Sequence, residues 1–278
     1  MLTHPNFSPV IFSFGPFELF GKSIGPIGVH WYGLMYLLAF VTAWFIAVKR
    51  SEDKNSPIRK TQVEDLVVYG AIGVVVGGRL GYAFFYHADY LMTDFWWLFR
   101  IWEGGMSFHG GFIGVVIAMI WYARRHKISL LALLDFIAPA IPPGLGFGRL
   151  GNFINQELWG RPTDLPWAML FPNDKEQLAR HPSQLYEAFF EGLVLFLIIY
   201  WFSRKPRPTG AACGVGIFFY GVFRTGVEFT REPDSHIKFD LFGWVTRGQL
   251  LSIPMIIGGL VLVILAYKNP RSLLGRYN

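Results

Sequence analysis

Residues 148–160 place several polar and charged side chains at the end of a long apolar region. The stretch reads GRLGNFINQELWG and holds Arg149, Asn152, Asn155 and Glu157. Charge within an apolar region of membrane length is costly unless a function requires it. Arginine binds phosphate through two parallel hydrogen bonds and stays ionised when it is partly dehydrated. The stretch therefore predicts a polar cavity that binds an anion.

Similar side chains occur near the ends of other apolar segments. His109 precedes two glycines, and Arg231 follows a segment that carries Tyr220, Arg224 and Glu228. The spacing of four residues places these last three side chains on one face of a helix. Two or three arginines at one depth predict an anionic phospholipid headgroup as the ligand. Glutamates would hold the arginines, and asparagines would bond glycerol hydroxyls or ester carbonyls.

Each of these residues also has a structural interpretation. His109 fits a helix start that is bonded to the backbone, and Arg224 with Glu228 fits an internal ion pair at helical spacing. Glu157 fits a partner that neutralises Arg149. The convergence of several charges at one depth favours the functional interpretation, because the combined free-energy cost of placing them in the membrane is explained by one shared function.

Other conspicuous residues allow the same two interpretations. Tyr32 and Tyr220 fit an aromatic belt at the membrane surface. Arg79 interrupts an apolar segment and fits an arginine with structural partners. Residues 181–187 (HPSQLYE) fit a loop followed by a helix start that Ser183 caps.

The composition is that of an integral membrane protein. Hydrophobic residues make up 53% of the 278 residues and charged residues only 16%, against about 25% charged residues in soluble domains. We predict an all-α, polytopic membrane protein with about seven transmembrane helices in a single domain over residues 1–278. The expected spans are residues 29–48, 66–85, 109–122, 135–147, 185–202, 211–229 and 250–267. Prolines and glycines interrupt the fourth, so a helix there should kink or end before Arg149.

The distribution of basic residues predicts the orientation of the chain. Short loops rich in Lys and Arg face the cytoplasm. Such loops occupy residues 49–60, 124–127, 204–207 and 268–276. The amino terminus is then periplasmic and the carboxyl terminus cytoplasmic, with extracytoplasmic loops at residues 86–108, 149–184 and 230–249. The net charge of +6 reflects this orientation and not nucleic-acid binding.

The single cysteine, Cys213, lies inside an apolar segment. It permits neither a disulfide within the chain nor a cysteine metal cluster, and it has no evident activating partner for nucleophilic catalysis. These observations leave open a lipid-modifying enzyme, a membrane transporter of an organic anion and a non-catalytic lipid-binding scaffold. The lack of an internal repeat weakly disfavours the transporter.

Residues 148–160 resemble the signature of bacterial prolipoprotein diacylglyceryl transferases, and the resemblance covers nearly the whole chain. The further matching motifs are residues 30–36 (HWYGLMY), 102–111 (WEGGMSFHGG), 181–187 (HPSQLYE), 220–224 (YGVFR) and 228–234 (EFTREPD). A thirteen-residue match with fixed polar positions is a specific signal.

The resemblance implies the first step of lipoprotein maturation. An sn-1,2-diacylglyceryl group passes from phosphatidylglycerol to the lipobox cysteine thiol of a prolipoprotein, a thioether forms and glycerol 1-phosphate leaves. The implied place is the bacterial cytoplasmic (inner) membrane, with the active site toward the periplasmic leaflet. The implied partners are phosphatidylglycerol, lipobox-containing signal peptides and membrane lipids, with no nucleic acid. No metal or other cofactor is implied.

The resemblance also assigns roles to residues. The functional positions are Tyr32, His109, Arg149, Asn152, Glu157, Gly160, Tyr220, Arg224 and Glu228. Phosphatidylglycerol would bind at Arg149, Arg224, Asn152 and Gly160. Our own first choice of base for the substrate thiol is His109, because imidazole titrates near the working pH, and Glu157, Glu228, a tyrosine or water are the alternatives. Arg149 and Arg224 would stabilise charge on the departing phosphate.

Overall fold

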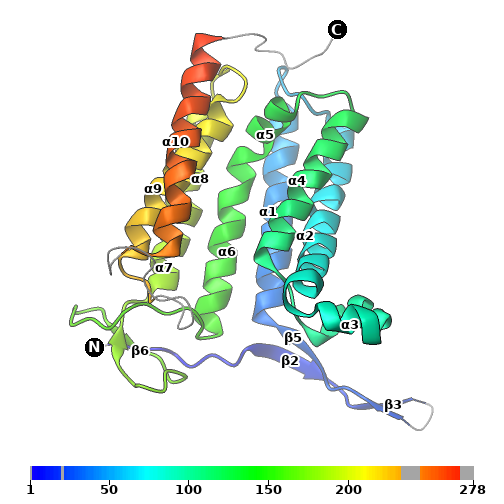
Figure 1. The fold of residues 1–278 in the computed structure, drawn as a ribbon, viewed down its shortest axis with the longest axis vertical. Coiled ribbons are helices and arrows are strands. Elements are labelled where there is room, and N and C mark those ends of the chain that lie inside the picture. The colour runs from blue at the N-terminus through cyan, green and yellow to red at the C-terminus, as the bar shows by residue number, and fades with distance from the viewer. Residues whose placement is uncertain (1, 20–21, 233–244, 270–278) are drawn as a thin grey trace. The chain divides into compact units, whose positions relative to one another are not determined.

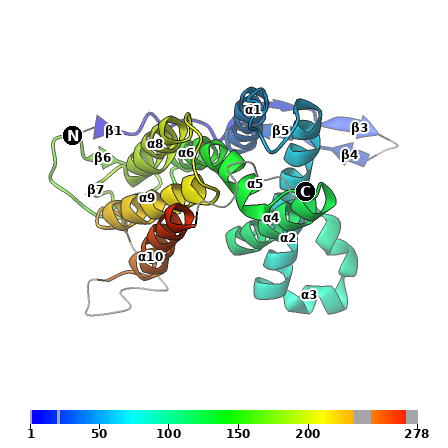
Figure 2. The same ribbon diagram turned by 90° about the horizontal axis from the view of Figure 1, so that it is seen from above.

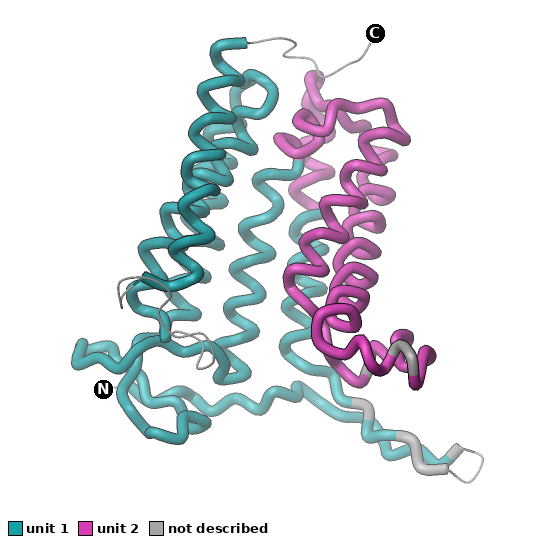
Figure 3. The backbone as a smooth tube through the Cα atoms, viewed as in Figure 1, with its two compact units in different colours: residues 1–43, 137–270 teal, residues 44–136, 271–278 magenta. Residues whose placement is uncertain are grey.

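The computed structural model describes residues 2–19, 22–232 and 245–269. The structure is predominantly helical. It divides into two compact units, residues 1–43 with 137–270 and residues 44–136 with 271–278 (Figure 3). Each unit has its own helix packing, and the prediction of a single domain over residues 1–278 stays a prediction.

The helices of the described residues follow the predicted spans closely. They are α1 (Trp31–Ser51), α2 (Val63–Tyr86), α3 (Ala88–Thr93), α4 (Phe108–Arg125), α5 (Leu130–Ile137), α6 (Ile141–Ile154), α7 (Ser183–Glu187), α8 (Leu195–Phe202), α9 (Ala211–Glu228) and α10 (Arg247–Lys268). Short 3-10 turns are η1 (Lys60–Gln62), η2 (Phe95–Phe99), η3 (Ile101–Glu103) and η4 (Ala138–Ala140), and η5 (Ala188–Val194) is a π-helical turn.

Five helical segments are long and apolar enough to cross a membrane. They are Trp31–Ser51, Lys60–Tyr86, Leu130–Ile154, Ser183–Phe202 and Arg247–Lys268. The chain is therefore a mostly helical, polytopic membrane protein, as predicted. Helices α4 and α9 have 18 residues each, and their charged side chains lower their mean hydropathy. The count of seven spans stays a prediction.

Helices α2 and α4 lie side by side in the second unit (Figure 1). Their glycines face one another and let the two backbones pack closely. A Cβ atom on Gly114 would lie 2.1 Å from the carbonyl oxygen of Gly73, and one on Gly110 would lie 2.3 Å from that of Gly77. Small residues let two helix backbones approach where lipid offers no hydrophobic driving force for association. The glycines of α2 therefore set the spacing of this helix pair.

Gly114→Ala is expected to destabilise the α2–α4 pair by about 1–3 kcal/mol, because the added methyl group meets backbone that cannot move aside. Thermal unfolding in detergent would measure the loss. Gly70→Ala is the matched control, since a Cβ atom on Gly70 meets nothing within 4 Å. Equal unfolding temperatures for the two variants would contradict the close packing.

Arg79 of α2 has structural partners, in agreement with one of its two interpretations. Its guanidinium donates to the carbonyl oxygens of Trp97 at 2.6 Å, Leu98 at 3.0 Å and Arg100 at 3.1 Å, and it lies 4.2 Å from the Trp97 ring centroid. Backbone carbonyl dipoles thus stabilise the buried charge. These bonds hold the segment between α2 and α4, which was predicted as a loop and contains α3, η2 and η3.

The proline-rich fourth span is interrupted before Arg149, as predicted, but its helix ends later than expected. The helix kinks at η4, which contains Pro139, but α6 then continues through Arg149 to Ile154. Pro142 and Pro143 occupy the first turn of α6, where a missing N–H removes no helical hydrogen bond. The expectation that residue 149 begins a loop is therefore wrong, and Arg149 is held on a helix.

The first unit contains α6 to α10. Helices α7 and α8 and the turn η5 form one continuous helical run, and α9 lies between α8 and α10 (Figure 2). Gly146 of α6 approaches Gly192 of η5 so closely that a Cβ atom on Gly192 would lie 2.7 Å from the Gly146 Cα. This packing aligns α6, α7 and α9, which carry the candidate site.

Short strands add to the predicted all-α fold. Strand β2 (Val10–Phe14) pairs with β5 (Ile27–His30), β3 (Phe17–Leu19) with β4 (Lys22–Ile24), and the sheet β1–β6–β7 joins Leu2–Thr3, Met169–Leu170 and Ala179–Arg180. Strands of two to five residues are too short for a clear alternating pattern. The last sheet ties the start of the chain to the loop after α6. Of the predicted loop 230–249, residues 233–244 lie outside the described residues.

Candidate active site

Three arginines converge on the carboxylate of Glu187, a fully buried residue of α7. Arg149 Nε lies 2.6 Å from Glu187 Oε2, Arg224 Nη1 lies 3.3 Å from the same oxygen, and Arg231 Nη1 lies 3.7 Å from Oε1. The arginines come from α6, from α9 and from the segment just after α9. Buried charges interact strongly because little water screens them. One carboxylate of α7 therefore joins α6 to the carboxyl end of α9 and the residues directly after it.

Two more glutamates complete this arginine cluster. Glu228 Oε2 lies 2.6 Å from Arg224 Nη2, and Glu191 Oε1 lies 3.8 Å from Arg224 Nη1. Thr246 Oγ1 donates to Glu228 Oε1 at 3.0 Å. A Cβ atom on Gly248 would lie 2.6 Å from the Glu228 carboxyl group, so this glycine leaves room for it. Arg224 is thus held firmly by carboxylates on two helices.

Arg149 has donors left for a ligand. Its side chain is 21% exposed, and it contacts Glu187 through Nε. Within residues 2–19, 22–232 and 245–269, Glu187 is the only ion-pair or hydrogen-bond partner of this guanidinium. The two terminal nitrogens therefore remain available, and they have the geometry that binds phosphate in a two-pronged manner.

Glu157 is held at the end of α6 by amide groups. Asn152 Nδ2 and Asn155 Nδ2 each donate to one of its carboxylate oxygens at 3.3 Å. Asn152 is buried, while Glu157 is exposed. The interpretation of Glu157 as the partner that neutralises Arg149 is wrong, because Glu187 takes that position.

Tyr32 and Tyr220 pack against the same unit. A Cβ atom on Gly151 would lie 2.8 Å from the Tyr32 ring, so Tyr32 of α1 contacts α6 directly beside Asn152. Tyr220 packs against the buried cluster of Ala138, Leu195 and Ile199. Tyr220 therefore shares α9 with Arg224 and Glu228, and Tyr32 contacts the helix that carries Arg149 and Asn152. The catalytic roles of both tyrosines stay predictions.

Gly160 is a point of close backbone approach. A Cβ atom there would lie 2.4 Å from the carbonyl oxygen of Thr230 and 2.6 Å from the His181 Cβ. The Gly160 N–H donates to the His181 carbonyl oxygen at 2.9 Å, and Gly160 forms a bridge with Arg231. This contact fixes the segment that carries Arg231. Direct binding of phosphatidylglycerol by Gly160 stays a prediction.

Comparison with known proteins adds to this geometry. Residues 21–265 match the family model described as prolipoprotein diacylglyceryl transferase. Three relatives are each named phosphatidylglycerol–prolipoprotein diacylglyceryl transferase. Their sequences are 54% (Teredinibacter turnerae), 51% (Pseudomonas fluorescens) and 53% (Methylococcus capsulatus) identical to this chain. The alignments cover 97%, 98% and 97% of this chain and 94%, 98% and 99% of the relatives, in the same order. The chain belongs to the prolipoprotein diacylglyceryl transferase family. The resemblance seen in the sequence motifs is thereby confirmed.

In this member of the prolipoprotein diacylglyceryl transferase family, His109 belongs to the second compact unit, whereas the arginine cluster belongs to the first. It lies in the first turn of α4, which Ser107 caps by accepting a hydrogen bond from the Gly110 N–H at 3.2 Å. Its side chain is exposed, and its ring packs edge-on against Phe108 with centroids 5.7 Å apart. Its role as the base stays a prediction.

Glu187 and Glu191 were not among the predicted site residues. Both are fully buried. Both carboxylate oxygens of Glu191 lack a hydrogen-bond partner among the residues that the structure describes. Two acidic residues four positions apart inside an apolar span are costly without a function, and that signal was present in the sequence.

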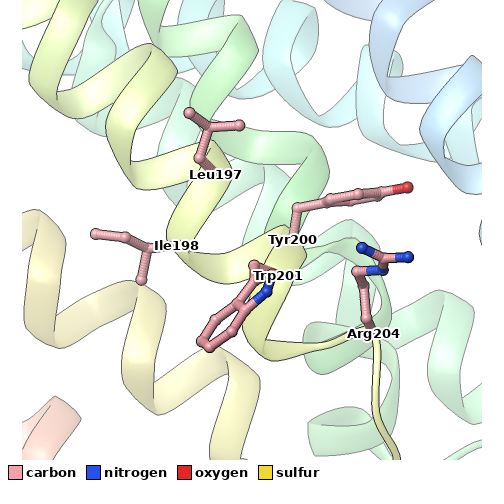
Figure 4. Close-up of a pocket in the computed structure, with 5 residues that line it drawn as sticks. All are labelled: Leu197, Ile198, Tyr200, Trp201 and Arg204. Carbon is pink, nitrogen blue, oxygen red and sulfur yellow. The ribbon is translucent and has the colours of Figure 1, made fainter.

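A pocket at the carboxyl end of α8 is separate from this site. It is lined by Leu197, Ile198, Tyr200, Trp201 and Arg204 (Figure 4). At 1.5 Å per helical residue, these residues lie about 15–25 Å along the helical run from Glu187. The pocket is mostly apolar in character, so the candidate active site is the arginine cluster.

His4 anchors the start of the chain to the end of α6. The Asn6 N–H donates to His4 Nδ1 at 3.0 Å, so Nε2 carries the proton and donates to the Phe153 carbonyl oxygen at 3.0 Å. Burial lowers the pKa of His4 below its ordinary value of 6.5, and the hydrogen bond to Phe153 opposes this only in part. Protonation of Nδ1 would break the bond from Asn6.

The anchoring by His4 is therefore expected to weaken as the pH falls below about 6.5, the unfolded-state pKa, and to be complete above it. Hydrogen-exchange protection of the Leu2 and His4 amides, which bond Ala168 and Leu170, should drop several-fold between pH 7.5 and pH 5. His4→Phe keeps the ring packing and should remove this pH dependence. Equal protection of the wild-type amides at both pH values would contradict the assignment.

Proposed function

We propose that this protein transfers the sn-1,2-diacylglyceryl group of phosphatidylglycerol to the lipobox cysteine of prolipoproteins. The observation that carries the proposal is the convergence of Arg149, Arg224 and Arg231 on Glu187, with donors of Arg149 left for a phosphate. Family membership supports the same reaction, because the relatives carry it in their name.

The chemistry is a displacement at the glyceryl carbon that bears the phosphate ester. The substrate sulfur attacks this carbon, a carbon–sulfur bond forms, and the carbon–oxygen bond to phosphate breaks. The thiol proton passes to a base, for which His109 is our candidate. Glycerol 1-phosphate leaves with the bonding electrons. The thioether is the lipidated cysteine.

The arginine cluster fits the leaving group of this reaction. Negative charge grows on the phosphate oxygens as the bond breaks, and fixed cations stabilise it without reorganisation. Arg149 would contact the phosphate directly, and Arg224 would add charge from α9. Glu157, Asn152 and Gly160 would border the glycerol part, and Tyr32, Tyr220 and Glu228 would complete the catalytic set.

The site is placed near the outer surface of the bacterial inner membrane in this proposal. Helices α4 and α9 would span the membrane together with the five longer segments, giving seven spans. The amino terminus would then be periplasmic and the carboxyl terminus cytoplasmic. Labelling of single cysteines with a membrane-impermeant reagent tests it: a residue in 155–180 should react from outside, and one in 204–207 should not.

The reaction is tested with the purified protein, phosphatidylglycerol vesicles and a lipobox peptide. Release of glycerol phosphate and a mass gain on the peptide cysteine are expected. A peptide with alanine in place of that cysteine should give no release. No release with a competent peptide would overturn the proposal, and flux of an organic anion without lipid turnover would favour a transporter.

Cys213→Ala is expected to change turnover less than about twofold, because the nucleophilic sulfur comes from the substrate and the replacement removes a single sulfur atom. Cys213 is half-buried in α9. Glycerol phosphate release by the variant is the measurement. Loss of turnover in a variant with an unchanged unfolding temperature would point to an enzyme-bound diacylglyceryl thioether and would contradict direct attack by the substrate sulfur.

A further inference from the structure

Glu157 lies in a turn with an unusual backbone. Gln156 and Leu158, on either side of it, have φ angles of 55° and 58°. Residues other than glycine adopt this left-handed conformation at a cost, so the surroundings must hold it in place. The turn directs the Glu157 carboxylate toward Asn152 and Asn155. Contacts from outside the turn must therefore hold its backbone, and with it the Glu157 carboxylate, in this conformation.

The contacts that fix the turn come from α7. Gln184 Nε2 donates to the Glu157 carbonyl oxygen at 2.6 Å, and Ser183 Oγ donates to the Leu158 carbonyl oxygen at 3.0 Å. Gln184 and Ser183 are both fully buried. Both bonds end on carbonyl oxygens of the turn, so α7 acts directly on the backbone around Glu157.

Gln156 supports the turn from its other side. Its side chain is buried, its Nε2 donates to Asn6 Oδ1 at 3.0 Å, and its Oε1 accepts from the Asn173 N–H at 3.0 Å. One amide thus connects the turn to the amino-terminal segment and to the loop after α6. A shorter or apolar side chain at this position cannot make both bonds.

We propose that Gln156 and Gln184 are positioning residues that hold the Glu157 carboxylate in its working geometry. This inference rests on the proposed function, in which Glu157 belongs to the site. It also gives α7 two tasks, because Gln184 fixes the Glu157 turn and Glu187, three residues later, holds the arginines. The phosphate cluster and the Glu157 turn then share one short helix.

The test is a double-mutant cycle in glycerol phosphate release. Gln184→Met keeps the side-chain length and removes the donor. It should lower kcat at least about 10-fold and leave KM for phosphatidylglycerol within about 3-fold, because small misplacements near a reacting centre cost rate. Gln184→Met combined with Glu157→Gln should be no slower than Glu157→Gln alone. The proposal would be overturned if the double variant lost kcat by the product of the two single losses. It would also be overturned if Gln184→Met left kcat unchanged.

The matched control is Gln177→Met. Gln177 also has a left-handed backbone, with φ 51°, and its amide donates to carbonyl oxygens of the same loop, at Phe171 and Pro172. It makes no bond to residues 156–158, so kcat should not change. If Gln177→Met and Gln184→Met lowered kcat equally, the loss would reflect a general destabilisation of the loop, and the proposal would also be overturned.

A second measurement does not depend on turnover. The Glu157 N–H donates to the Asn152 carbonyl oxygen at 2.9 Å. Its hydrogen-exchange protection should fall at least about 10-fold in Gln184→Met and stay unchanged in Gln177→Met, since local opening exposes this amide. Ser183→Ala is the milder variant if Gln184→Met does not fold. Unchanged protection would refute the positioning role, whereas failure of the proposed reaction would show as an inactive wild-type protein.

Discussion

Glu187→Ala is expected to destabilise the folded protein by about 3–5 kcal/mol and to abolish diacylglyceryl transfer. The reason is that removal of one buried carboxylate leaves its cationic partners uncompensated. Those partners are Arg149, Arg224 and Arg231, all within 3.7 Å of Glu187. Thermal unfolding in detergent and glycerol phosphate release measure the two effects.

The control for this variant is Glu176→Ala. Glu176 also pairs with an arginine, Arg180, but its side chain is 66% exposed. Removing an exposed carboxylate costs little, and the buried Arg180 keeps its buried partner Asp174 at 2.6 Å, so the unfolding temperature should hardly move. Phosphatidylglycerol should raise the unfolding temperature of Glu187→Ala more than that of the wild type, since a bound phosphate supplies the missing negative charge. Equal destabilisation by both variants would contradict the central role of Glu187.

Arg149→Ala is expected to lower turnover about 10²–10³-fold, the usual loss when one stabilising donor is removed from a developing anion. Arg149→Lys should recover little of this, because an ammonium group cannot bind phosphate through two parallel bonds. The measurement is glycerol phosphate release at saturating peptide and phosphatidylglycerol.

Arg204→Ala serves as the comparison for Arg149→Ala. Arg204 is an exposed arginine at the far end of the helical run that begins with α7, where it lines the pocket of Figure 4. Its replacement should leave turnover unchanged. If Arg149→Ala retained more than half of the wild-type rate, the phosphate would have to bind elsewhere.

The sequence predicted the long helices well and their ends less well. Apolar runs bounded by basic loops locate spans to within a few residues, because the cost of charge in lipid is large. The extension of α6 to Ile154 was missed because Pro142 and Pro143 are tolerated in a first helical turn. Whether these prolines end the helix depends on their position in it, and not on their presence alone.

The site was predicted in its residue types and in the ion pair of Arg224 with Glu228 at helical spacing, but the central position of Glu187 was missed. Arg149, Arg224 and Glu228 were expected near one another, and the structure joins them. Glu187 fits a helix start in the sequence, since its partners Arg149 and Arg224 are far from it along the chain and no local pattern reveals them. Glu157 is close to Arg149 in sequence, but a left-handed turn directs it to the asparagines instead.

The π-helical turn η5 directly follows Glu187 and contains Glu191. A π-helical turn holds one residue more than an α-helical turn, so η5 sets the angular phase between α7 and α8. Inserting one further residue there, beside the exposed Phe189, would rotate the Glu187 side of the helix by about 100° relative to α8. The three guanidinium groups would then lose their shared counter-charge without any substitution of a charged residue.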